Sequence, residues 1–314
     1  MYGQYFVLFA IMFTGWFLRR INFIDDKMDH SMNKLIVYFA YPCLIVHNIG
    51  NLQMTSRIIV DFLTAFGASL ALFYIYALFC YFYVKVRKFP AEEAGVAEFS
   101  MASPNNGFMG FPVAMIFFGE TGLLLMLAHN AAMNFYIFTY GTRALRRNSA
   151  DKRRAASGGV FKAALRLLVN PNILALIIGF IASLLGGIIP EVVDEYLMYI
   201  GNISTPMAMI FIGSTLAGYR FGDIIKSRIA IESSIVKLFI LPLLTILIIY
   251  FVPLAGITKS ILVLGISFPT AATVSMLAEQ EGQGAGTASR ILFLSTVISI
   301  GTIPLIINVI NMLF

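Results

Sequence analysis

Long apolar stretches separated by short polar segments make up most of this chain, a pattern typical of a polytopic membrane protein. Apolar runs long enough to cross a bilayer recur along the whole sequence. They predict an all-α protein with ten membrane-spanning helices, so both chain ends should lie on the same side. The predicted helices cover residues 3–19, 34–53, 60–84, 94–118, 122–142, 168–188, 195–217, 229–251, 258–278 and 288–313.

The fourth predicted helix is interrupted at its centre by the residues Pro104, Asn105, Asn106 and Gly107. Proline removes a backbone donor and clashes with the preceding turn, and Asn and Gly favour a local break. Lipid does not tolerate the freed backbone groups, so the break should be buried in protein or line a wet cavity. The helix that restarts after the break has free N–H groups and a partial positive charge, which attract anions.

Proline positions correspond between the two halves of the chain. Pro42 in FAYPCLIVHNIG pairs with Pro206 in ISTPMAMIFIGS, and Pro104 pairs with Pro269 in SFPTAATVS at almost the same separation. Each half contains five predicted helices, so the halves should insert with opposite orientation, as in the inverted repeats of secondary transporters. We therefore expect a first repeat over 1–143, a basic cytoplasmic linker over 144–164, and a second, inverted repeat over 165–314.

The two breaks predict a binding site for a carboxylate, because their crossing would bring two half-helix N-termini to one point. Pro269, Thr270 and Thr273 supply the second break. A lone proline would indicate only a kinked helix, whereas the PNNG cluster and its counterpart favour a functional break. Other polar residues beside the paired prolines are candidates for the same cavity, with helix–helix hydrogen bonding as the alternative role. They are Asn48, Ser204 and Thr205.

Charge supports a membrane protein and gives its expected orientation. Hydrophobic residues make up 59% of the chain and charged residues 12%, with a net charge of +6 and a mean hydropathy of +0.85. These values exclude a soluble globular protein. All but three of the 22 Lys and Arg residues lie in predicted loops of one side; Arg57 and Lys259 lie opposite, and Lys237 lies within a span. The positive-inside rule then places both termini outside a cytoplasmic membrane, and the charges require no nucleic-acid partner.

Ionisable residues inside predicted spans are costly and usually functional. Lys237 is the deepest, and we expect it to stabilise the crossed half-helices, to neutralise substrate or to carry a coupling proton. The alternative is a structural ion pair with Glu98 or Glu232, although a spacing of five residues suits a direct pair with Glu232 poorly. The cysteines Cys43 and Cys80 lie in apolar runs and suggest neither a disulfide nor a metal site, and no cofactor is expected.

Competing functions have weaker support in the sequence. It contains no GxSxG, no HExxH and no paired membrane aspartates, so an enzyme is not expected. An anion channel would need a continuous pore lined by charges or carbonyls, and paired breaks suit a carrier better. The linker at 144–164 is most simply a flexible connection that sets topology, with binding of anionic lipid as the alternative.

Six stretches resemble the auxin efflux carrier family, which includes plant auxin exporters and bacterial malate or malonate permease-like proteins. They are SPNNGFMGFPVAMIFFGE (103–120), NPNILALIIGF (170–180), STPMAMIFIGSTLAG (204–218), VKLFILPL (236–243), FPTAATVSMLAEQEG (268–282) and ASRILFLSTVISIGTIPL (288–305).

The resemblance implies a fold like that of bile acid symporters, with ten helices in an inverted repeat. It also implies a scaffold of helices 1, 2, 6 and 7, a moving domain of helices 3–5 and 8–10, and a homodimer formed through the scaffold. The short linker is similar to that of bacterial members. We therefore expect alternating-access transport of a small carboxylate such as malate or malonate, with auxin-like acids, an anion channel or a membrane-embedded receptor as alternatives.

Overall fold

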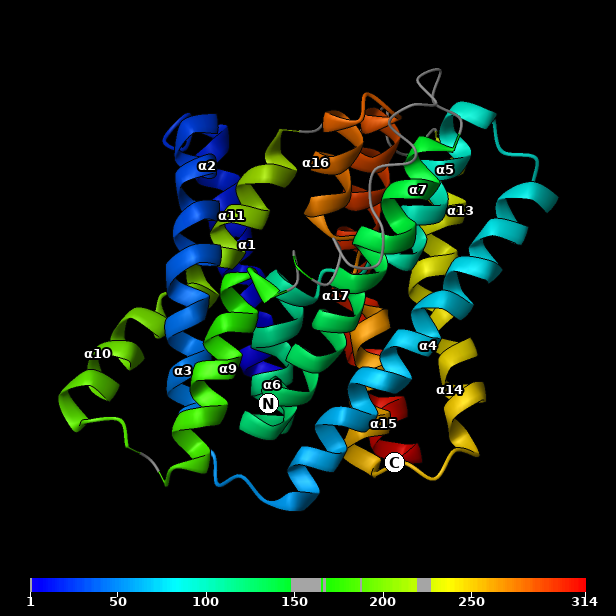
Figure 1. Ribbon diagram of the computed structural model, residues 1–314. Coiled ribbons are helices and arrows are strands. Elements are labelled where there is room, and N and C mark those ends of the chain that lie inside the picture. Colours follow the sequence, from blue (N-terminus) through cyan, green and yellow to red (C-terminus); the bar gives the residue numbers. More distant parts are fainter. Residues whose placement is uncertain (1, 148–164, 166–167, 187, 219–226) are drawn as a thin grey trace. The chain divides into compact units, whose positions relative to one another are not determined.

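A computed structural model describes the chain except for residues 1, 148–164, 166–167, 187 and 219–226. Within the described ranges the secondary structure is helical, and the exception is one isolated antiparallel bridge between Pro104 and Thr270. The predicted all-α class is therefore confirmed for this part of the chain. The helices are drawn in Figure 1.

The helices form two compact units. Unit 1 comprises Met1–Phe62, Phe111–Leu124 and Leu165–Gly218, and unit 2 comprises Leu63–Gly110, Leu125–Ala164 and Tyr219–Phe314. Unit 1 contains the described parts of predicted helices 1, 2, 6 and 7, and unit 2 contains most of the others. The exception is Phe111–Leu124, which follows the first break and belongs to unit 1 although the residues before it belong to unit 2.

Unit 1 is built on close helix pairs. Its helices are α1 (Tyr2–Arg20), α2 (Asp26–Leu35), the π-helical turn η1 (Ile36–Ala40), α3 (Tyr41–Gly50), α9 (Pro171–Leu184), α10 (Glu191–Asn202) and α11 (Ser204–Ala217). α1 packs on α11, and α3 packs on α9 and α10. A Cβ atom on Gly213 would lie 1.8 Å from the carbonyl oxygen of Met12, so the α1 and α11 backbones touch there and glycine is required.

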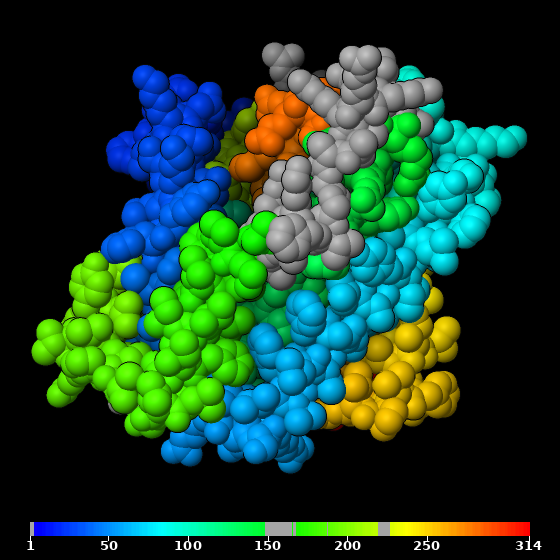
Figure 2. Space-filling model, in the orientation of Figure 1, coloured from blue at the N-terminus to red at the C-terminus, as the bar shows by residue number. Residues whose placement is uncertain are grey.

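One face of α9 is apolar and exposed, as expected for a lipid-facing helix. Its exposed side chains are Leu174, Ile177, Ile178, Ile181 and Leu184. The space-filling view in Figure 2 shows this green segment at the surface. The predicted helix 34–53 began too late, because α2, η1 and α3 follow one another without a gap from residue 26 to residue 50.

Unit 2 surrounds α17, which packs on α5, α13, α15 and α16. Its elements, together with the parts of α4 and α6 that belong to unit 1, are α4 (Ser56–Val86), α5 (Ala91–Ala102), η2 (Asn106–Gly110), α6 (Phe111–Tyr136), η3 (Ile137–Gly141), α7 (Thr142–Arg146), α13 (Arg228–Ile235), η5 (Val236–Ile240), α14 (Leu241–Tyr250), α15 (Gly256–Ser267), α16 (Ala272–Gln280) and α17 (Ala285–Leu313). α6 includes the end of the predicted helix 94–118 and most of the predicted helix 122–142, and a bend at Gly119, where φ is 64°, separates these two parts.

Five described helical segments are long and apolar enough to cross a membrane. They are Ser56–Val86, Asn106–Arg146, Glu191–Ala217, Arg228–Tyr250 and Ala285–Leu313. The apolar helices Pro171–Leu184 and Gly256–Ser267 are shorter. These segments support a multi-pass membrane protein, while ten crossings and an inverted repeat stay predictions.

Candidate functional site

The two interrupted helices of unit 2 cross where both chain segments become extended. α5 ends at Ala102 and α15 ends at Ser267, and the residues that follow pair as a short antiparallel bridge. The Asn105 N–H donates to the Pro269 carbonyl at 2.7 Å, and the Ala271 N–H donates to the Ser103 carbonyl at 2.9 Å. The prediction that helices 4 and 9 break at Pro104 and Pro269 is therefore confirmed. In Figure 1, α15 and α16 are separate helices on either side of their break.

Thr270 links the crossing to α5 and α17 through hydrogen bonds. Its hydroxyl donates to the Ser100 carbonyl at 3.0 Å, and its N–H donates to the Ser295 hydroxyl at 3.1 Å. The last carbonyls of a helix lack partners within the helix, so Thr270 satisfies one that the end of α5 leaves free. Thr270 is fully buried, and these bonds assign it to the framework of the crossing.

Asn105 begins the helical turn that follows the break. Its side-chain Oδ1 accepts from the Phe108 N–H at 3.3 Å, and its carbonyl accepts from the N–H groups of Met109 and Gly110. This is the capping role for which Asn is well suited. The side-chain amide nitrogen makes no hydrogen bond to the described residues, so this donor stays available at the crossing.

Asn106 and Gly107 differ in their surroundings. The Asn106 side chain is fully buried, and its amide nitrogen reaches only the sulfur of Met133, at 3.6 Å. Its Oδ1 has no hydrogen-bond partner among the described residues. Gly107 is partly exposed, and a Cβ atom at this position would have no described neighbour within 4 Å. Thr273 lies in the first turn of α16 and is exposed, so it does not share the burial of the two asparagines.

The remaining candidates, Asn48, Ser204 and Thr205, belong to unit 1. Asn48 donates to the Leu44 carbonyl at 2.8 Å, and Ser204 donates to the Gly201 carbonyl at 2.6 Å. Both bonds are local to the chain. The alternative role considered for these residues was hydrogen bonding between helices, and these two local bonds are of a different kind. The expected role of these residues in the substrate cavity stays a prediction.

Lys237 lies in η5, which packs on α5, α15 and α17. Two of these helices, α5 and α15, are the ones that end at the crossing. The Lys237 side chain is fully buried, and Nζ has no hydrogen-bond partner among the described residues.

The alternative ion pairs for Lys237 are wrong, because arginines occupy both acids. Glu98 is fully buried and accepts from Tyr140 at 2.6 Å and from Arg147 at 2.9 Å. Glu232 accepts from Arg87 at 2.5 Å and from Arg228 at 2.7 Å. The planar arginine fork binds carboxylates in a geometry that a lysine cannot reproduce.

His129 is a residue whose setting the sequence did not indicate. Its Nδ1 is 2.8 Å from the Ser69 hydroxyl, and its ring lies 4.9 Å from that of Phe73. Its Nε2 has no hydrogen-bond partner in the described part of the chain. A Cβ on Gly265 would lie 2.4 Å from Nε2, so α15 approaches the imidazole closely only because position 265 is glycine.

The structure combines apolar helices with two helix breaks, and the extended residues at these breaks pair with each other. This combination is typical of one class, the membrane transport proteins with discontinuous helices. The sequence agrees with that class over nearly its whole length. The chain belongs to the membrane transport protein family, which it matches over residues 1–307, and the resemblance to auxin efflux carriers is thereby confirmed.

Curated relatives share low identity over most of the chain. An uncharacterized transporter of Methanothermobacter thermautotrophicus is 22% identical, with 94% of each chain covered. A protein of Rhizobium meliloti named "Putative malonate transporter" is 25% identical, covering 96% of this chain and 93% of its own. The uncharacterized transporter YfdV of Escherichia coli is 25% identical, covering 78% of this chain and 77% of its own.

Proposed function

We propose that this protein is a secondary transporter that moves a small mono- or dicarboxylate across the membrane by alternating access. The observation that carries the proposal is the crossing, where two helices end and two begin again around paired backbone. The name of the Rhizobium relative makes malonate the first substrate to test. Auxin-like acids are less favoured because the linker is short.

The carboxylate would bind where η2 and α16 begin. The first N–H groups of a helix carry partial positive charge, although those of Asn106 and Phe108 in η2 already donate to the Pro104 carbonyl and to Asn105 Oδ1. The carboxylate would therefore use the remaining N–H groups at the two helix starts. The free amide nitrogen of Asn105 adds a donor beside them. Asn105 is 3% exposed, so substrate can reach it only after the site opens, as alternating access requires.

Lys237 would couple the site to protons or balance the charge of a dicarboxylate. The Lys237 amine is buried without a hydrogen-bonding partner among the described residues, and η5 packs on both helices that end at the crossing. A homodimer formed through unit 1 is the assembly that the family resemblance implies.

Counterflow in proteoliposomes tests the proposal. Vesicles loaded with unlabelled malonate should take up labelled malonate faster than empty vesicles, with saturation. Asn105→Ala removes a charge-assisted hydrogen bond and should weaken malonate binding by about 1.5–3 kcal/mol, or roughly ten- to a hundredfold. Asn33→Ala in α2 is the matched control and should bind as the wild type does.

Two results would contradict the proposal at different points. Unsaturable flux that unlabelled malonate inside does not accelerate would indicate a channel. Wild-type malonate affinity in Asn105→Ala would show that the carboxylate is held elsewhere and that the break serves as a hinge.

A further inference from the structure

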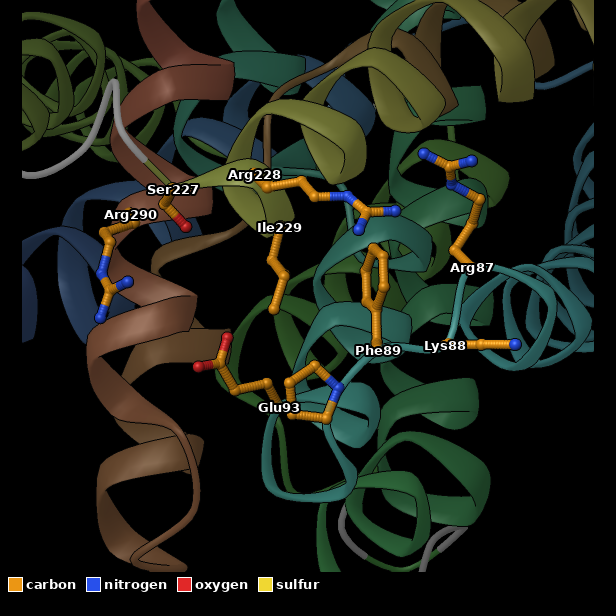
Figure 3. Close-up of a pocket in the computed structure, with 9 residues that line it drawn as sticks. Arg87, Lys88, Phe89, Glu93, Ser227, Arg228, Ile229 and Arg290 are labelled. Carbon is orange, nitrogen blue, oxygen red and sulfur yellow. The ribbon is translucent and has the colours of Figure 1, made fainter.

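A cavity of about 350 Å³ opens at one end of unit 2, where the α4–α5 connection meets the start of α13 and the first part of α17. It lies apart from the crossing, and the proposed transport does not use it. Figure 3 shows its lining. The lining residues are Arg87, Lys88, Phe89, Pro90, Glu93, Ser227, Arg228, Ile229 and Arg290.

Positive charge exceeds negative charge around this cavity. Four of the lining residues are cationic, and Glu93 is the acidic one. Glu232 neutralises part of the excess, because Arg87 and Arg228 both bind its carboxylate. Lys88 and Arg290 have no ion pair with the described residues, and Figure 3 shows them on opposite sides of the cavity. Both lie at the edge of the cavity, and the Lys88 side chain extends outward from it in this view.

Exposed apolar side chains also lie on two of the helices that contribute residues to the cavity or lead to it. Phe89, Pro90 and Ile229 form part of its lining. On α4, Leu78, Phe82 and Val86 are 58%, 55% and 77% exposed, and their spacing of four places them on one helical face. Ile231 and Ile235 form a similar exposed pair on α13. A ligand with an anionic head and apolar chains matches this arrangement.

We infer that the cavity binds the phosphate group of an anionic phospholipid, whose acyl chains lie along the exposed apolar residues of α4 and α13. The guanidinium groups have donors beyond those that Glu232 uses, and arginine binds phosphate through paired N–H groups. Basic pockets at the cytoplasmic edge of membrane helices suit such headgroups. A soluble phosphate ester offers the same phosphate chemistry, but it would make no use of the apolar residues.

Retention of lipid by the purified, delipidated protein tests the inference. Native mass spectrometry would compare phosphatidylglycerol, phosphatidylcholine and glycerol 1-phosphate. The test variant is K88Q/R290Q, which spares the arginines that hold Glu232. The control is K27Q/K34Q, which removes two exposed cations from α2. Each basic residue near a lipid headgroup contributes about fivefold to affinity, so the test variant should lose at least about tenfold for phosphatidylglycerol.

The expected result is that wild type and K27Q/K34Q prefer phosphatidylglycerol to phosphatidylcholine and that K88Q/R290Q does not. The charge-conserving variant K88R/R290K should retain the preference, which separates lost charge from lost folding. Equal losses in the test and control variants would indicate general attraction and overturn the site. Undiminished binding in a folded K88Q/R290Q would overturn it as well. Equal affinity for glycerol 1-phosphate and phosphatidylglycerol would overturn the lipid as the source of the phosphate.

Discussion

Replacing Lys237 by methionine should stabilise the protein while abolishing transport. Methionine has a similar length and fits a buried site, but it carries no amine. Lys237 is 0% exposed, and the described residues provide its Nζ with no hydrogen bond. A side chain in such a position lowers stability and persists when function requires it.

The magnitude follows from the cost of burying an unsatisfied polar group. Mutational data place that cost at about 1–3 kcal/mol, so Lys237→Met should raise the free energy of unfolding by about that amount. A structural ion pair predicts the opposite sign, because breaking a buried pair costs about 3–5 kcal/mol. The arginine partners of Glu98 and Glu232 argue against such a pair.

Thermal unfolding and malonate counterflow, measured on the same preparations, check this prediction. The midpoint of unfolding should rise in Lys237→Met, and counterflow should fall to the level of empty liposomes. Lys34→Met, at an exposed position on α2, should change neither. A lowered midpoint would refute the argument from burial, and normal counterflow with an unchanged pH dependence would remove Lys237 from the mechanism.

Two further predictions concern packing and topology. Gly265→Ala places a Cβ 2.4 Å from His129 Nε2 and should lower the free energy of unfolding by about 1–3 kcal/mol. Gly301→Ala, whose Cβ would have no described neighbour within 4 Å, should not lower it in the same thermal assay. A cysteine at Val192, which is 78% exposed, should react with an impermeant maleimide from outside the cell, and one at position 151, outside the described residues, only from the cytoplasm. The reverse labelling would contradict the orientation derived from charge.

The sequence predicted the crossing because the chemistry that breaks a helix is local. Proline lacks an N–H wherever it lies, and asparagine and glycine next to it make a continued helix costly. The apolar context then requires other protein groups to satisfy the break, and Pro269 supplied the expected partner. Thr270 was correctly placed at the break, but its bonds to Ser100 and Ser295 depend on helices that sequence patterns do not bring together.

The partners of the buried charges could not be predicted in the same way. Arg147 reaches Glu98 from beyond α7, and Arg87 reaches Glu232 from the end of α4. Both arginines were counted only as loop charges that set topology. Their side chains are long enough to serve two roles, so a charge at the edge of a span can neutralise an acid within it.

Helical geometry explains why Lys237 lies in a π-helical turn. Three π-helical turns, η1, η2 and η5, are each followed two residues later by a proline, namely Pro42, Pro112 and Pro242. A proline ring clashes with the carbonyl four residues before it, and the wider turn relieves that clash. In η5 the wider turn contains Lys237, so the proline two residues beyond the turn shapes the backbone that carries the amine. The π-helical turn η2, which Pro112 follows, begins directly after Asn105. A proline therefore shapes the backbone next to both Asn105 and Lys237, the two residues on which the proposed mechanism depends.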